Sequence, residues 1–184
     1  PCDAIVNGKL VKTAPLENYE VLGHDGVEYE CFNTSGGLGT LPETLEGKAR
    51  DVSYRSIRYP GHCDILKLLL NDLGLERRRD LLKEIFEAAL PRTDQDVVLI
   101  FSTATGWIDG EYRERSFVNK SLAGQVNGKT WGAIQLTTAA GVTGVMDLMR
   151  QGKLSAQGFV RQEDVSLNDF MQTEFGRYYG KGEL

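Results

Sequence analysis

The chain has 184 residues, which suits one domain with a substantial core, or one domain with a small appendage. A net charge of -5 and the lack of any basic run argue against nucleic acid as a partner, and no apolar stretch reaches the roughly 20 residues that a membrane span needs. Three cysteines without a Cys-x-x-Cys pair, and only two histidines, indicate neither a disulfide framework nor a metal site. We therefore expect a cytoplasmic protein with reduced thiols.

Three Asn-Gly or Asp-Gly pairs stand between short apolar segments, and each predicts a tight β-hairpin. Residues 51–59 alternate in the manner of one more strand. Because a two-residue turn joins only antiparallel strands, the sequence predicts a mixed, mostly antiparallel sheet. The hairpin strands are expected over residues 4–6 and 9–11, 19–22 and 27–32, and 95–107 and 112–118.

A glycine-rich loop follows the second hairpin, with Gly36, Gly37 and Gly39 within four positions. It is not a nucleotide fingerprint, because that motif opens a helix directly and Pro42 is not expected to continue a helical turn. Three interpretations stay open: a tight turn before a surface loop, a loop that faces a substrate, and a phosphate site.

The strand over residues 51–59 should end at Tyr59, because the residue before a proline is pushed toward extended geometry. Gly61 and His62 then lead into a helix. Arg58 is thereby expected at a strand end, beside free backbone amides at a helix start. Both groups suit a carboxylate, the guanidinium by a two-pronged bond and the amides by the positive helix end. An arginine paired with a structural acid is the alternative.

Apolar residues at helical spacing predict four helices, over residues 65–73, 81–89 and 131–151 and from Ser166 onward. With the strands they predict an α+β fold whose helices pack on one face of the sheet. Gly141 and Gly144 each cost about 1 kcal/mol against alanine in a helix, so the third helix should pack closely on a neighbour or face a ligand. The charge run over residues 76–79 is either a solvated turn or an anion site.

Four segments resemble the saccharopine dehydrogenase family, and they occur in the family's order over nearly the whole chain. The Arg-Tyr-Pro-Gly strand end is the most specific of them. By this resemblance, residues 1–184 are a single C-terminal domain for substrate binding and dimerisation, similar to the carboxy-terminal domain of glyceraldehyde-3-phosphate dehydrogenase. The segments are residues 34–41, 56–62, 136–142 and 158–165.

The resemblance implies oxidation of the secondary amine that joins lysine to a glutarate, a reaction in which NAD or NADP takes the hydride. The cofactor would be bound mainly by a Rossmann domain that this sequence lacks. The chain is therefore expected to be a fragment of a longer enzyme and to be inactive alone. The expected partners are that Rossmann domain, a second copy of the chain in a homodimer, and a small substrate with carboxylate and amine groups.

The resemblance also suggests roles for particular residues. Arg58 would clamp a substrate carboxylate, with Tyr59 and the Gly61 amide beside it. His62 could assist proton transfer, since imidazole titrates near neutral pH, although a structural role is the alternative for a lone histidine at a helix start. Further residues expected to line the same pocket are Thr34, Ser35, Gly36 and Gly37.

Two other functions stay open. Relatives that make carboxynorspermidine or carboxyspermidine are rivals for the substrate. A non-catalytic dimerisation module, which kept the fold and lost the site, is the second alternative. Cys63 and Trp107 are expected in the core or at an interface.

Overall fold

The structure is a computed structural model that describes residues 1–179. The chain divides into two compact units, which we call unit 1 (residues 1–91) and unit 2 (residues 92–184). Strands and helices occur in both units, so the predicted α+β class is confirmed in this coarse form. None of the described helices is long and apolar enough to cross a bilayer.

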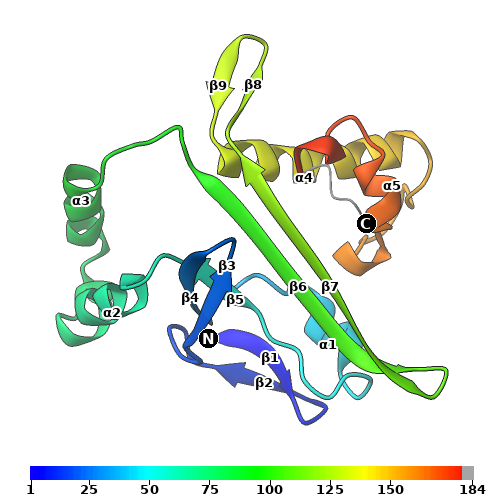
Figure 1. The fold of residues 1–184 in the computed structure, drawn as a ribbon, viewed down its shortest axis with the longest axis horizontal. Coiled ribbons are helices and arrows are strands. Elements are labelled where there is room, and N and C mark those ends of the chain that lie inside the picture. Colours follow the sequence, from blue (N-terminus) through cyan, green and yellow to red (C-terminus); the bar gives the residue numbers. More distant parts are fainter. Residues whose placement is uncertain (180–184) are drawn as a thin grey trace. The chain divides into compact units, whose positions relative to one another are not determined.

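Unit 1 contains the first two predicted hairpins, and both are confirmed (Figure 1). One forms a two-stranded sheet, and the other is extended by a third antiparallel strand. Ile5 of the first hairpin and Val52, in the segment before the third strand of the other sheet, exchange backbone hydrogen bonds of 2.8 and 3.0 Å. The strands are β1 (Cys2–Val6), β2 (Lys9–Thr13), β3 (Glu20–His24), β4 (Val27–Asn33) and β5 (Arg55–Arg58).

The glycine-rich loop is followed by a short helix, α1 (Leu41–Leu45), which the sequence was not expected to form. Pro42 is accommodated because it lies in the first turn, where a backbone N–H has no partner within the helix. The loop therefore does open a helix, although one of only five residues.

The core of unit 1 lies between the three-stranded sheet and the helix that follows it. Phe32 on β4 packs against Leu16 and Cys63, and Leu66 and Leu70 lie against this cluster. The predicted helix over residues 65–73 begins three residues earlier than expected and ends in a π-helical turn. The helical segments are α2 (His62–Lys67), η1 (Leu68–Asp72), η2 (Leu75–Arg77) and α3 (Arg79–Ala89).

Unit 2 contains the third predicted hairpin, whose strands are the two long arrows in Figure 1. A fourth hairpin turns at Asn127-Gly128, and its second strand ends at residue 131, where the sequence predicts the start of the third helix. The segments are β6 (Val97–Ile108), β7 (Glu111–Leu122), β8 (Gly124–Val126), β9 (Lys129–Trp131), α4 (Ala133–Arg150), η3 (Gln162–Asp164), α5 (Leu167–Met171) and η4 (Gly176–Tyr179).

The glycines of α4 lie where other segments of unit 2 approach closely. A Cβ atom at Gly144 would meet the ring of Phe170, and one at Gly141 would meet the hydroxyl of Tyr179. Close packing therefore accounts for both residues, and no ligand is needed to explain them.

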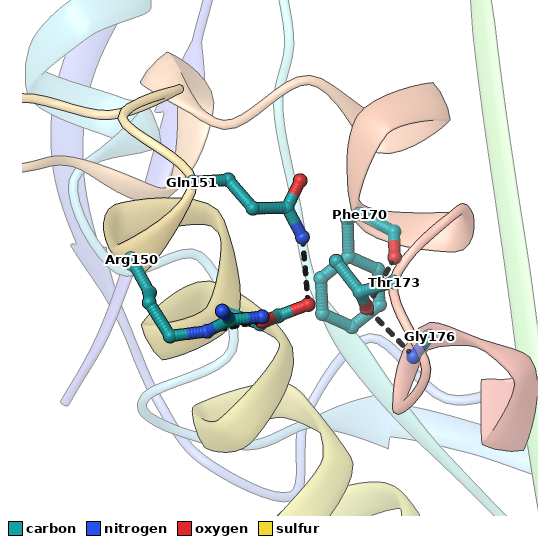
Figure 2. Close-up of polar contacts among 6 residues, drawn as sticks. Arg150, Gln151, Phe170, Thr173 and Gly176 are labelled. Carbon is teal, nitrogen blue, oxygen red and sulfur yellow. Dashed lines mark hydrogen bonds and ion pairs between the residues drawn. The ribbon is translucent and has the colours of Figure 1, made fainter.

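Polar contacts close the ends of α4 and α5 (Figure 2). Arg150 and Gln151 both donate to the carboxylate of Asp147, at 2.6 and 2.8 Å. The Thr173 hydroxyl donates to the Phe170 carbonyl and accepts from the Gly176 amide, at 2.7 and 2.9 Å.

The sheets differ from the expectation of one mixed sheet with helices on one face. In residues 1–179 every strand pair is antiparallel, and the strands form four separate sheets of two or three strands. Turn chemistry specifies which consecutive strands pair, and it carries no information on how hairpins combine.

Candidate functional site

Arg58 lies at the end of β5 and is exposed to solvent. Its Nη1 donates to the neighbouring Ile57 carbonyl at 2.8 Å, and Arg58 forms no ion pair with any residue in the range 1–179. Arg58 is therefore an exposed cation at a strand end, and not one half of an internal ion pair.

Glu30 is paired with Arg58 in the register of β4 and β5, but its side chain is only 1% exposed. Oε2 accepts from the Gly61 amide at 2.8 Å, and Oε1 accepts from the Cys63 amide at 2.5 Å. The expectation that the Gly61 amide is open to a substrate carboxylate is therefore wrong, because a carboxylate of the chain itself already binds it. Gly61 has a φ of 93°, a left-handed value that favours glycine at this turn.

His62 is the first residue of α2, and its ring stacks on Phe32 with 6.0 Å between centroids and 14° between planes. Partial burial lowers the pKa of the imidazole, the nearby Arg58 cation lowers it further, and Glu30 opposes both effects. The lowered pKa favours the neutral form of the imidazole, which can accept a proton.

Tyr59 is 60% exposed, and its ring stacks on Tyr29 with 5.5 Å between centroids. Tyr29 precedes Glu30 on β4, and successive side chains of a strand point to opposite faces. Tyr59 thus lies against the face of the sheet opposite to the one that carries Glu30 and Arg58.

The glycine-rich loop lies beside the start of β5. The Thr34 hydroxyl is 2.7 Å from the hydroxyl of Ser56, a residue that is 8% exposed. Gly37 lies against the ring of Tyr54, where a Cβ atom would clash. Gly36 has a φ of 91°, so this turn requires a residue without a side chain. Ser35 and Gly36 are exposed.

The predicted site residues therefore form two groups, at opposite ends of β5. Asn33, just before the loop, pairs with Arg55, whereas Glu30 pairs with Arg58. Three residues of strand separate these pairs, which corresponds to about 10 Å. Because Ser56 and Arg58 are two residues apart, both groups are on the face of the sheet that α2 covers.

A small pocket of about 120 Å³ lies elsewhere in unit 1, beside β1 and the segment 51–54. Its lining includes Cys2, Asp3 and Asn33, and none of the predicted site residues. Within residues 1–179, no three His, Cys, Asp or Glu side chains gather in a way that could hold a metal ion.

Sequence reasoning missed Glu30 and Ser56. The signal for Glu30 is its position two residues before Phe32, which puts a carboxylate on the same strand face as a core phenylalanine. A charged side chain on that face needs hydrogen-bond donors nearby, and the helix start supplies them.

The chain matches no model of a known protein family. The likeness to the saccharopine dehydrogenase family therefore stays a prediction from the four segments that carry it.

Proposed function

We propose that this chain is the substrate-binding part of a nicotinamide-dependent oxidoreductase of the saccharopine dehydrogenase type, acting on the secondary amine of an amino-acid conjugate. The observation that carries the proposal is the exposed guanidinium of Arg58, which has no internal ion pair within residues 1–179. An exposed, uncompensated arginine at a strand end is suited to bind a carboxylate by two parallel hydrogen bonds.

The second group of residues suits the far end of a long substrate. Ser56, whose hydroxyl contacts that of Thr34, is two residues from Arg58 on the same sheet face, which corresponds to about 7 Å of strand. A substrate with acid groups at both ends could place one at Arg58 and the other at these hydroxyls. Ser35, Gly36 and Gly37 belong to this second group in the proposal.

His62 would move the proton of the substrate amine. Its neutral imidazole lies on the sheet face that carries both groups, stacked on Phe32. Oxidation of a secondary amine to an imine releases one proton, and a neutral imidazole is a suitable acceptor for it.

The described residues do not fit a dinucleotide cofactor. The amides at the start of α2 are bound by Glu30, and those at the start of α4 are bound by Asp96. The glycine-rich loop leads into a helix of five residues in which Pro42 lacks an N–H. The proposal therefore assigns NAD or NADP to a separate Rossmann domain, and gives this chain the binding of acid groups and the handling of a proton.

The likeness to the carboxy-terminal domain of glyceraldehyde-3-phosphate dehydrogenase, the single-domain organisation, the homodimer and the cytoplasmic location belong to the same proposal. They rest on the resemblance and on the sequence composition.

A non-catalytic interaction module is the competing function, and one observation favours it. The pocket of about 120 Å³ in unit 1 and a shallower one beside the β3–β4 turn are both lined by residues other than Arg58 and the glycine-rich loop. An exposed arginine outside these two pockets would suit a protein partner as well as a small molecule.

An assay of the intact gene product separates these possibilities. The enzyme would be given saccharopine or carboxynorspermidine, each with NAD and with NADP, and the reduced nicotinamide would be followed by its absorbance. Turnover of saccharopine supports the proposal, and turnover of carboxynorspermidine alone would transfer it to that substrate. No turnover of either would leave the interaction module as the better account.

A further inference from the structure

The carboxylate opposite Arg58 is turned away from it. Directly paired residues of an antiparallel sheet have neighbouring side chains, and a Glu-Arg pair in this position would usually neutralise itself. Glu30 instead has both oxygens bound to the Gly61 and Cys63 amides, inside the core. The Arg58 charge is left exposed as a result.

The same contacts join three segments that the proposed site uses. Glu30 is on β4, beside Phe32 in the strand, and the amides that it binds come before and after His62. These two bonds hold the first residues of α2 against the sheet, where the His62 ring stacks on Phe32. Gly61, the residue before α2, has no side chain with which to cap the helix, so Glu30 takes that role from another strand.

We propose that Glu30 is a positioning residue for the turn between β5 and α2. It fixes this turn and holds His62 in place. It also leaves the Arg58 guanidinium available to a substrate carboxylate. This inference rests on the proposed function of Arg58. Glu30 itself is buried and does not contact the substrate in this proposal.

The test uses the 184-residue chain and glutarate, a small dicarboxylate, as the probe. Binding would be measured by chemical-shift titration of the ¹⁵N-labelled protein, well below the unfolding temperature of each variant. The variants are Glu30→Gln, which keeps the size of the side chain and loses one acceptor, Arg58→Ala, and the matched control Glu28→Gln. Glu28 is exposed on β4, two residues before Glu30, and its substitution removes the same negative charge.

We expect Arg58→Ala to abolish binding, Glu30→Gln to raise the dissociation constant about tenfold, and Glu28→Gln to leave it within about twofold. A residue that only stabilised the fold would lower the unfolding temperature of Glu30→Gln and leave the affinity of the folded chain unchanged. Binding that depends on Arg58 but is equal in Glu30→Gln and the wild type would overturn this inference alone. If the wild-type chain binds no glutarate, the proposed function of Arg58 fails, and this inference fails with it.

A measurement on the wild-type chain keeps the inference testable if Glu30→Gln does not fold. Saturating glutarate should shift the Nε–H resonance of Arg58 and leave the amide resonances of Gly61 and Cys63 nearly unchanged, because Glu30 keeps them. Large shifts at both amides would mean that the ligand displaces Glu30, which would overturn its positioning role.

Discussion

The start of α4 offers the most direct test of the account of how this chain folds. Its N-terminal neighbour Gly132 has no side chain, and the carboxylate of Asp96 accepts from the Ala133 and Ile134 amides at 2.5 and 3.0 Å. Loss of an N-cap acceptor costs about 1 kcal/mol, and loss of a negative charge at a helix start adds about 0.5 kcal/mol. Because Asp96 serves two amides, we expect Asp96→Ala to lower the free energy of unfolding by about 2 kcal/mol.

Urea unfolding, followed by circular dichroism and by tryptophan fluorescence, would measure this change. Asp96→Asn keeps one acceptor and should lose about half as much. The matched control is Asp94→Ala, which removes the same charge from an exposed position two residues earlier and should stay within about 0.5 kcal/mol of the wild type. Equal losses in Asp96→Ala and Asp94→Ala would refute the capping role.

Three further predictions concern unit 1. The pKa of His62 is held below its usual value of about 6.5, so the unfolded chain binds this proton first as the pH falls. The stability that depends on the neutral ring is therefore present above about pH 6.5 and is lost as the pH drops toward the folded pKa. An NMR titration, with His62→Gln as the control, measures the midpoint. Burial raises the pKa of the Cys31 and Cys63 thiols, so both should react with a disulfide reagent only after unfolding. Rapid reaction of the native chain would contradict their place in the core. Phe32→Ala should cost about 3 to 5 kcal/mol in urea unfolding, whereas Val21→Ala, at an exposed position of the same sheet, should cost less than about 1 kcal/mol.

Local turn chemistry made the hairpins predictable. At each of the three predicted turns an Asn or Asp takes a positive φ and a glycine follows it, which is the geometry that these pairs favour. The fourth turn, at Asn127-Gly128, has the same chemistry, but its strands have only three residues and no apolar alternation revealed them. The short helix after the glycine-rich loop is not expected from the sequence because proline usually ends a helix, but Pro42 lies in the first turn, where it is tolerated.

The two carboxylates that cap helices could not be predicted from local sequence. Glu30 and the Gly61 amide are 31 positions apart, and Asp96 and the Ala133 amide are 37 apart. Sequence patterns within one element describe its own periodicity and caps, and they do not identify a donor that tertiary folding brings in from elsewhere. For this reason the sequence predicts an open Gly61 amide. The place of Arg58 at a strand end depends only on local sequence and was easier to predict.

The central claim is that Arg58 binds a carboxylate of the substrate, and steady-state kinetics of the intact enzyme test it most directly. The Michaelis constant for saccharopine would be compared between the wild type, Arg58→Ala and the control Arg77→Ala, which loses the same charge at an exposed residue of unit 1. The account predicts a rise of about tenfold or more in Arg58→Ala, equivalent to about 1.4 kcal/mol, and no change in Arg77→Ala. A Michaelis constant unchanged in Arg58→Ala would contradict it.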